Sequence, residues 1–347
     1  MTGEKMASWT TRGLLLAAGI AFCAPATARA NEVADFYRGK NVELFIGYSV
    51  GGGYDIYARV LARHMGRHMP GNPTIVPRNM EGAGSVRLTN WLYSAAARDG
   101  SVFGTISRGV PFDPILGRPG SQFEATKFSW IGSANDEVSI CVTWHTSGVT
   151  DMEGLRQKEV VVGAAGAGSD DDQFPRVLNG VLGTKMRVIS GYPGGNDVVL
   201  AMERGEVNGR CGWSWTSVKS TYPQWIRDKK INIVSQLGLS KHPDLKDYPS
   251  IMDFAKTDED RQILRLIFAR QGLGRPFVAP PGVPAKRLAA LRKAFSDTMV
   301  DPLFLADAEK SKLEINPLDG HQVDALVKQV YAETSPATAK KAAAMLP

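Results

Sequence analysis

A glycine-rich connection between an apolar run and a helical pattern constrains this chain more than any other feature. The segment Val42–Arg59 reads VELFIGYSVGGGYDIYAR, in which Gly51, Gly52 and Gly53 separate the apolar run from a helix headed by Asp55. Glycines let backbone N–H groups approach a bound group closely, and the first turn of a helix leaves further N–H groups without partners. The segment therefore predicts an anion site between a strand and a helix.

The glycine loop does not fit the common nucleotide-binding motifs. It has neither a G-x-G-x-x-G pattern at the helix start nor a terminal Gly-Lys-Ser/Thr. Two further strand, glycine loop and helix segments follow at Gly163–Ser169 and Gly191–Asp197. Because ligands bind outside the carboxyl ends of parallel strands, we expect two α/β units that present these loops to a common cleft.

Hydrophobic periodicity supports an α/β fold. Strand-like runs alternate with helical patterns, which predicts parallel sheets covered by helices. The expected strands are Val42–Tyr48, Val102–Ser107, Val160–Gly163, Met186–Ser190, Ile231–Leu237 and Gly274–Ala279, and the expected helices are Asp55–His68, Ser85–Ala97, Asp171–Leu182, Asp197–Arg204, Gln262–Arg270, Ala285–Thr298 and His321–Glu333.

The N-terminus has the pattern of a secretory signal. Lys5 and Arg12 precede the apolar run Leu14–Ala24, and Ala28-Arg29-Ala30 has the small residues of a cleavage site. The apolar run is about half the roughly 20 residues that a membrane-spanning helix needs, which argues against a membrane anchor. We expect residues 1–30 to be removed after Ala30 and the remaining chain to reside in the periplasm.

Charge, cysteine and histidine patterns exclude several classes of function. The net charge of +6 is mild, and no Lys/Arg block suggests nucleic acid. Beyond the signal only Cys141 and Cys211 remain, and export allows either a disulfide between them or two buried thiols. His64 and His68 share a helix face but lack a third ligand, so no metal site is expected. No cofactor is expected either.

Six ordered motifs together resemble the periplasmic solute receptors of tripartite tricarboxylate transporters, the Bug family, over nearly the whole chain beyond the signal. The family's Pro-Gly-Gly-x-x-Asp loop is similar to residues 50–55, although Val50 replaces the proline. The other motifs are Asn79–Gly84 for Asn-x-x-Gly-Ala-Gly, Asp99-Gly100, Tyr192–Gly195 for Tyr-x-Gly-Gly, Gly205–Val207 for Gly-x-Val, and Ala279–Pro284 followed by Asp301-Pro302.

The resemblance implies a two-lobed periplasmic binding protein fold of type II. It places lobe 1 at residues 31–136 and 268–347 and lobe 2 at residues 137–267. It also implies a monomer that captures a small-molecule carboxylate by lobe closure and delivers it to the membrane subunits of a transporter, without catalysis.

Carried over by position, the resemblance implies a set of ligand-binding residues. They hold the carboxylate largely through backbone groups and hydroxyls near helix starts, which needs no salt bridge. The residues are Tyr48, Ser49, Gly51, Gly52 and Gly53 in lobe 1, and Gly168, Ser169, Tyr192 and Gly194 in lobe 2.

Two arginines and two tryptophans are further candidates with open alternatives. Arg108 follows an expected strand and either pairs with a second carboxylate of the ligand or is a solvated or interlobe arginine. Arg210 has the same ambiguity. Trp213 and Trp215 can face the same side, where they would either line the space for an aromatic or apolar ligand body or pack in the core.

The acidic residues near the loops have structural interpretations. A carboxylate at Asp55 would repel an anion, so we expect it to cap the helix or to fix the glycine loop. The run Asp170–Asp172 fits a helix start and lacks calcium-loop spacing.

Two other functional classes remain open from the sequence. An exported hydrolase would need a nucleophile motif, and Ser214 lacks the second glycine of G-x-S-x-G. A ligand sensor that signals to a membrane protein would use the same fold and the same site as a transport receptor.

Overall fold

A computed structural model describes residues 1–3 and 31–346 of the chain. The predicted signal peptide and its cleavage site therefore lie almost entirely outside the described residues. Among the described residues, no helix is both long enough and apolar enough to cross a membrane.

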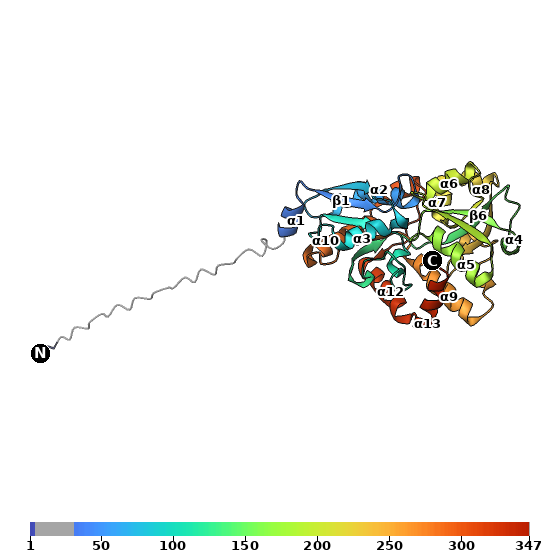
Figure 1. Cartoon of the computed structure of the whole chain (residues 1–347). Coiled ribbons are helices and arrows are strands. Elements are labelled where there is room, and N and C mark those ends of the chain that lie inside the picture. The colour runs from blue at the N-terminus through green and yellow to red at the C-terminus, as the bar shows by residue number, and fades with distance from the viewer. Residues whose placement is uncertain (4–30, 347) are drawn as a thin grey trace.

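Two β-sheets, each covered by helices, form two lobes that lie side by side (Figure 1). The sheet of lobe 1 has the strand order β11-β4-β10-β3-β1-β2. Its strands are β1 (Asn41–Ile46), β2 (Thr74–Asn79), β3 (Val102–Thr105), β4 (Ser129–Ser133), β10 (Pro276–Ala279) and β11 (Leu318–Asp319). Its helices are α1 (Asn31–Tyr37), α2 (Gly53–Met65), α3 (Val86–Ser94), α10 (Ala285–Met299), α11 (Pro302–Lys310) and α12 (Gly320–Glu333).

The sheet of lobe 2 has the strand order β7-β6-β8-β5-β9. Its strands are β5 (Ser139–Trp144), β6 (Val160–Ala164), β7 (Met186–Ser190), β8 (Gly209–Ser214) and β9 (Ile231–Leu237). Its helices are α4 (Met152–Gln157), α5 (Asp170–Leu182), α6 (Gly195–Glu203), α7 (Trp215–Thr221) and α8 (Pro223–Arg227).

The predicted parallel strands are present, but each sheet is mixed and contains strands of both directions. In lobe 1, β10 runs antiparallel to β3 and β4, and in lobe 2, β5 runs antiparallel to β8 and β9. Both β5 and β10 follow a crossing from the other lobe. A strand that arrives from the other lobe enters its sheet from the opposite end, so it runs against the strands joined by local strand–helix–strand connections.

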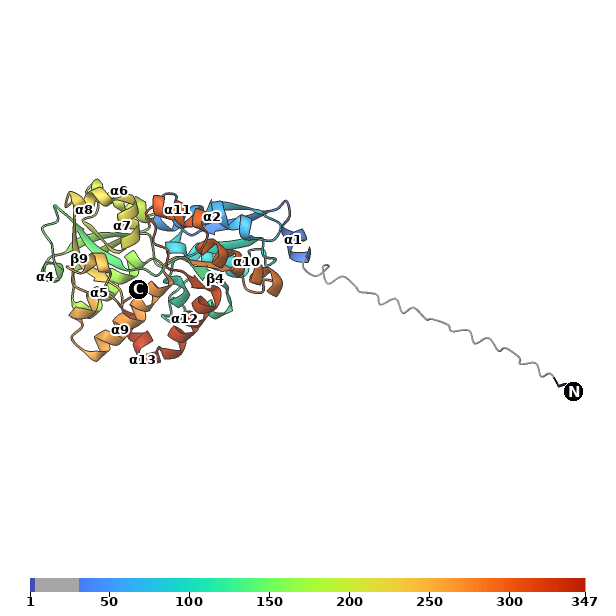
Figure 2. The ribbon, with the colours of Figure 1, turned by 180° about the vertical axis from the view of Figure 1, so that it is seen from behind.

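The chain crosses between the sheets twice before its C-terminal helices join the two lobes. The first sheet takes its strands from residues 41–133 and 276–319, and the second from residues 139–237. Helix α9 (Asp258–Phe268) lies in the second crossing, and α13 (Pro336–Ala344) packs against it. Figure 2 shows α9, α12 and α13 along one side of the molecule. The predicted lobe boundaries at residues 136 and 267 remain predictions.

The apolar core is partly shared between the lobes. One cluster of buried side chains joins α3 and α12 of lobe 1 with α5 of lobe 2 and with α9, through residues such as Leu88, Val323, Phe174 and Phe268. Separate clusters lie under α2 and α10 in lobe 1 and under α6 to α8 in lobe 2. The shared cluster holds one side of the two lobes together and leaves a cleft on the other side.

A disulfide joins Cys141 on β5 to Cys211 on β8, which resolves the alternative left open by the sequence. The two cysteines are direct partners in the antiparallel ladder and are separated by 70 residues along the chain. The disulfide therefore links the crossing strand β5 to the middle of the second sheet.

Replacing both cysteines by serine should lower the free energy of unfolding by roughly 2–4 kcal/mol. The crosslink closes a long loop, and its removal enlarges the conformational freedom of the unfolded chain. Guanidinium unfolding of the oxidised wild type and of the double variant measures the difference. A midpoint and slope equal to those of the wild type would contradict a stabilising crosslink.

Candidate functional site

A cavity of about 640 Å³, including its open mouth, lies between the two lobes. Lobe 1 contributes the glycine loop before α2, the end of β3 and Arg275. Lobe 2 contributes the starts of α5 and α6, the end of β8 and part of α7. The cavity thus lies at the carboxyl ends of β1, β3 and β8, where α/β folds bind ligands.

Four helices begin at the wall of this cavity. The wall includes Gly53, Asp170 and Gly195, which are the first residues of α2, α5 and α6, and Ser214, the N-cap residue of α7. The first turns of α2, α5 and α6 have backbone N–H groups without partners inside the helix, and the helix dipoles add partial positive charge. The first two N–H groups of α7 instead donate to the Val138 carbonyl at 2.9 Å and to Glu137 Oε1 at 3.4 Å. The cavity therefore favours a negatively charged group.

The glycine loop of lobe 1 is held in place by Asp55. The Gly51 N–H donates to Asp55 Oδ2 at 2.9 Å, and Gly51 adopts a φ of +87°, which favours glycine. Asn79 donates to Asp55 Oδ1 at 2.9 Å and to the Tyr48 carbonyl at 2.8 Å. Arg59 pairs with the same carboxylate. The prediction that Asp55 fixes the loop is confirmed, whereas the N-cap position of α2 is Gly52.

Seven of the eleven predicted ligand-binding residues lie at the cavity wall. They are Tyr48, Gly51, Gly52, Gly53, Arg108, Ser169 and Trp213. Their contact with a ligand stays a prediction. The remaining four predicted residues, Ser49, Gly168, Tyr192 and Gly194, do not line the cavity.

Ser49 and Gly194 instead lie where the lobes touch. The Ser49 hydroxyl donates to Asp197 Oδ2 at 2.7 Å, and Asn196 Nδ2 donates to the Val50 carbonyl at 2.9 Å. A Cβ atom at Gly194 would lie 2.3 Å from Ser49 Oγ, so a side chain at this position would displace the Ser49 hydroxyl. These residues close one edge of the cleft, with the two lobes in direct contact.

Gly168 and Tyr192 serve other contacts. The Gly168 N–H donates to the Ala83 carbonyl of lobe 1 at 3.1 Å. A Cβ atom at Gly168 would meet Val86, Val110 and the Gly84 carbonyl at 2.7–2.8 Å. Tyr192 packs against the apolar cluster under α6 to α8. Glycine motifs in a sequence thus mark close backbone approaches between the lobes as well as candidate ligand contacts.

Arg108 is an interlobe arginine. It is only 2 % exposed, and its Nε donates to Asp170 Oδ2 of lobe 2 at 2.6 Å. Its Nη2 donates to the Ser214 hydroxyl at 2.8 Å, and its Nη1 to the Gly274 carbonyl at 3.3 Å. Burial acts to lower the pKa of Arg108, but Asp170, Tyr54 and Glu137 together outweigh it and hold the pKa above its ordinary value.

Arg210 also reaches the cavity wall, and Trp215 does not. The Arg210 guanidinium pairs with Asp171 at 2.9 Å and lies over the Trp213 ring, 5.3 Å from its centre. The Trp215 indole N–H donates to Asp244 at 3.1 Å. The acidic residues Asp170–Asp172 at the start of α5 are buried and pair with arginines, so they are not solvated charges.

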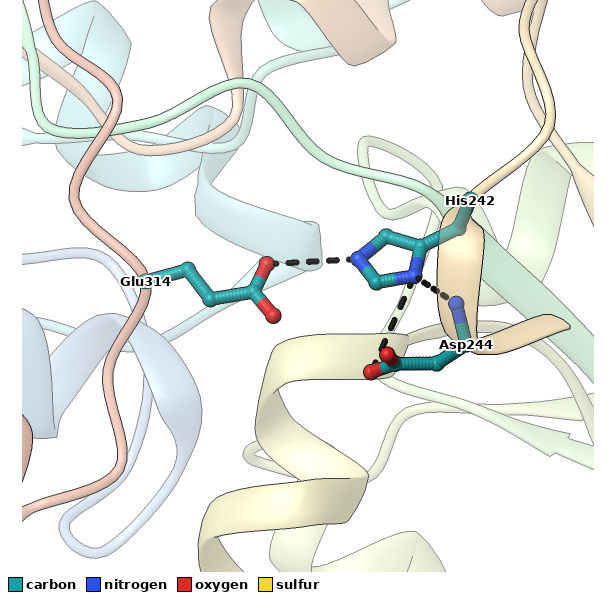
Figure 3. A group of neighbouring side chains, drawn as sticks. All are labelled: His242, Asp244 and Glu314. Carbon is teal, nitrogen blue, oxygen red and sulfur yellow. Dashed lines mark hydrogen bonds and ion pairs between the residues drawn. The ribbon is translucent and has the colours of Figure 1, made fainter.

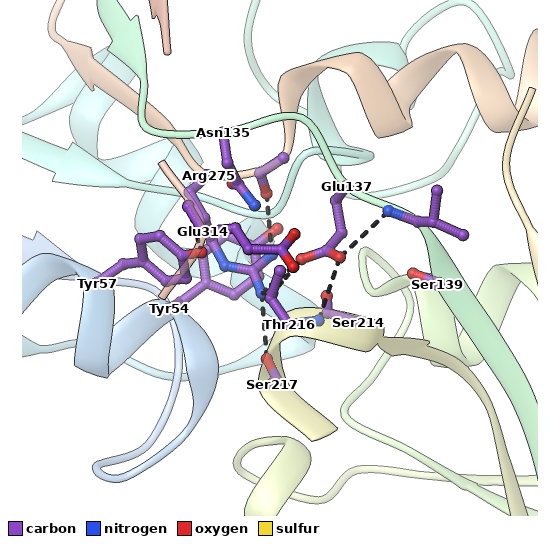
Figure 4. Close-up of polar contacts among 12 residues, drawn as sticks. Tyr54, Tyr57, Asn135, Glu137, Ser139, Ser214, Thr216, Ser217, Arg275 and Glu314 are labelled. Carbon is purple, nitrogen blue, oxygen red and sulfur yellow. Dashed lines mark hydrogen bonds and ion pairs between the residues drawn. The ribbon is translucent and has the colours of Figure 1, made fainter. Parts of the chain in front are cut away.

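Sequence reasoning missed Arg275, which lies at the cavity wall from the start of β10 (Figure 4). Its Nη2 lies 3.2 Å from Glu137 Oε2 and donates to the Ser217 hydroxyl at 3.1 Å. Its guanidinium lies over the Tyr54 ring at 4.8 Å. Arg275 immediately precedes the buried strand β10. The start of β10 lies at the cavity only because β10 runs antiparallel to β3, and the sequence does not show this direction.

A second polar cluster joins the lobes away from the cavity (Figure 3). His242 and Asp244 of lobe 2 and Glu314 of lobe 1 have ligand-type atoms within 4.8 Å of one another. Lys219 Nζ lies 2.6 Å from Asp244 Oδ2 and also contacts Glu314. The Asp244 N–H donates to His242 Nδ1 at 3.1 Å. The single Lys219 ammonium contacts both carboxylates, so the cluster forms an interlobe ion network.

Asp113 is a buried acid at the boundary between the lobes. It is 1 % exposed and accepts a hydrogen bond from Gln173 Nε2 of α5 at 2.8 Å. Burial raises the pKa of Asp113 to about 6 from its ordinary value of 3.8, and the hydrogen bond from Gln173 offsets only part of this effect. Folding therefore favours the protonated form of Asp113 relative to the unfolded chain, and the folded protein loses this proton as the pH rises through 6.

This raised pKa predicts a pH-dependent effect of Asp113→Asn. Because the folded pKa lies above the unfolded one, the stabilisation from proton binding is complete below pH 3.8 and is lost as the pH rises through 6. Asparagine does not titrate and keeps the acceptor for Gln173. The free energy of unfolding of the variant, relative to that of the wild type, should therefore be roughly 2–3 kcal/mol higher at pH 7 than at pH 4. Urea unfolding at both pH values tests this, and a constant difference would contradict it.

Comparisons with known proteins identify the fold. No protein-family model and no curated protein matches the sequence. The solved periplasmic binding protein BugD matches with a TM-score of 0.69 and 21% identity, over 88% of this chain and 97% of that one.

Two structures from Rhodopseudomonas palustris match similarly. MatC with bound malate has a TM-score of 0.69 and 16% identity, over 88% of this chain and 99% of that one. A protein with adipate has a TM-score of 0.67 and 16% identity, over 88% of this chain and 97% of that one. The chain therefore has the two-lobed fold of periplasmic binding proteins such as BugD and MatC.

Proposed function

We propose that the protein is a periplasmic solute-binding receptor that captures a carboxylate-bearing small molecule between its lobes. The observation that carries the proposal is the convergence of the starts of α2, α5 and α6 on one interlobe cavity. A cavity of this kind stabilises an anion through oriented N–H groups. The structural relatives that hold malate and adipate support the same ligand class.

The proposed carboxylate site lies at the glycine loop. Gly52 and Gly53 present the first N–H groups of α2, and Tyr48 lies on the same side of the cavity. Ser169 and Gly195 contribute from lobe 2. Ser49 and Gly194 take part indirectly, because their contact closes the cleft over the ligand.

The receptor is proposed to be exported, cleaved after Ala30 and monomeric in the periplasm. It would deliver its ligand to the membrane subunits of a tripartite tricarboxylate transporter. The signal-like N-terminus and the resemblance of the six sequence motifs support this assignment. A receptor of this kind performs no catalysis and needs no cofactor.

Thermal unfolding with a panel of aliphatic, amino and aromatic carboxylates tests the ligand class. The protein is first denatured and refolded to remove any ligand carried through purification. A ligand at about a hundred times its dissociation constant stabilises by roughly 2.7 kcal/mol, which raises the melting temperature by several degrees. A selective rise within one chemical class supports the proposal, and no rise with any carboxylate contradicts it.

Deletion of the gene distinguishes transport from sensing. Loss of uptake of one carboxylate is the expected result for a transport receptor. Loss of gene induction with uptake intact would instead assign the protein to a signalling system, and turnover of a ligand by the purified protein would indicate an enzyme.

A further inference from the structure

We infer that the ligand is a monocarboxylate whose remaining body is uncharged and largely apolar or aromatic. This inference rests on the proposed function and narrows it. Every charged side chain at the cavity wall is paired within the protein, and aromatic side chains form part of the same wall.

Each of the three arginines at the wall already has a carboxylate partner within the protein. Arg108 Nε lies 2.6 Å from Asp170, and Arg210 pairs with Asp171 through Nε at 3.0 Å and Nη2 at 2.9 Å. Arg275 lies 3.2 Å from Glu137. A second carboxylate on the ligand would therefore meet guanidinium groups that are already bound to carboxylates of the protein.

The arginines cannot easily change partners. Arg108 and Arg275 are 2 % and 1 % exposed, and the Arg210 side chain is 11 % exposed. Their other nitrogens donate to the carbonyls of Gly274 and Gly195 and to serine and threonine hydroxyls, with Arg275 Nε as an exception. Pulling one arginine toward a ligand would leave its own carboxylate buried and unpaired, which is strongly unfavourable.

The same pairing argues against an amino acid or another zwitterion. A ligand ammonium group needs an unpaired carboxylate at the wall. The two wall carboxylates, Asp170 and Asp171, each contact an arginine. Among the described residues at the cavity wall, the N–H groups at the starts of α2, α5 and α6 then remain to attract a negative charge, which matches one carboxylate.

Aromatic rings form much of the remaining wall. Tyr48 and Tyr54 stack with ring centres 4.7 Å apart on the lobe 1 side. Trp213 and Tyr222 meet edge to face at 5.6 Å on the lobe 2 side, and Val199 lies beside them. Such surfaces bind the apolar body of a ligand and leave an added charge without a partner.

Calorimetric titration with matched ligands tests the inference. The compounds 4-methylbenzoate, terephthalate and 4-(aminomethyl)benzoate place a neutral, an anionic and a cationic group at the same ring position. Hexanoate and adipate make the same comparison on a six-carbon chain. We expect the monocarboxylate of each set to bind at least about tenfold tighter than its charged counterparts.

The outcomes separate the inference from the proposed function. Equal or tighter binding of terephthalate, adipate or 4-(aminomethyl)benzoate would overturn the inference and leave the carboxylate receptor standing. Absence of binding by every carboxylate tested would overturn both.

A variant that leaves Arg210 without its carboxylate partner adds a second test. Asp171→Asn removes the charge that neutralises Arg210 while keeping an oxygen to accept the Ala165 N–H at 3.1 Å. The affinity ratio of terephthalate to 4-methylbenzoate should then rise at least about tenfold. Asp172→Asn is the matched control, because Asp172 pairs with Arg176 and does not line the cavity. An unchanged ratio in folded Asp171→Asn would overturn the inference.

Discussion

Replacing Gly52 by valine should reduce carboxylate affinity by at least roughly a thousand-fold while leaving the free energy of unfolding nearly unchanged. Gly52 lies at the cavity wall just before α2, where the backbone N–H groups face the proposed carboxylate. Its φ of −81° and ψ of 169° are extended values that any residue adopts. The fold therefore tolerates a side chain at this position, but the valine methyl groups occupy the space of the ligand.

A graded substitution at the same position is the control. A Cβ atom at Gly52 would lie 3.4 Å from Asn196 Oδ1 and 3.9 Å from the Ser49 carbonyl oxygen, so the β-carbon itself fits. Gly52→Ala should therefore weaken binding less than Gly52→Val. Calorimetric titration with the best ligand of the panel measures both affinities, and circular dichroism verifies the fold. An unchanged affinity in folded Gly52→Val would rule out the assigned carboxylate site.

Replacing Asp170 by asparagine should lower the free energy of unfolding by roughly 3–5 kcal/mol, because removing one partner of a buried ion pair leaves the other charge uncompensated. Asp170 bonds Arg108 at 2.6 Å and lies 3.6 Å from Arg270, which is fully buried. Burial lowers the pKa of Arg270, and the nearby negative charge of Asp170 counteracts this effect. Loss of that charge removes a stabilising partner from both arginines.

Two variants make the Asp170 prediction specific. Asp324→Asn removes one partner of the exposed Lys328–Asp324 pair, and should change the stability by less than about 1 kcal/mol. The double variant Arg108→Met with Asp170→Asn removes both charges of the closest buried pair and should be more stable than Asp170→Asn alone. Guanidinium unfolding measures all three. A single Asp170→Asn variant as stable as wild type would contradict the prediction.

Local signals in the sequence identified much of the fold. The glycine loops correctly mark the ends of β1, β6 and β7 and the starts of α2, α5 and α6. These features depend on neighbours in the chain, because apolar runs set strands and glycine permits the turn into a helix. The start of α9 at Asp258 was missed by four residues, although the capping box of Thr257 and Asp260 is a local signal for it.

Other elements lacked a clear local signal. Strand β2 contains Pro77, which sequence patterns disfavour in strands, but β2 lies at the edge of its sheet, where proline is tolerated. Strands β4 and β5 were also missed, and they flank the first crossing between the lobes. Their pairing partners lie far away in the chain, so their positions depend on the whole topology.

By itself, the sequence determined the α/β class, the glycine loop before α2 and the role of Asp55, because each depends on residues within a few positions of one another. Only the tertiary structure decided that Arg108 pairs with Asp170, that Arg275 reaches the cavity and that Cys141 meets Cys211. It also placed Ser49 against Asp197 at the closing edge of the cleft. These contacts join segments separated by 62 residues or more, and burial in a shared interlobe space, rather than local propensity, selects their partners.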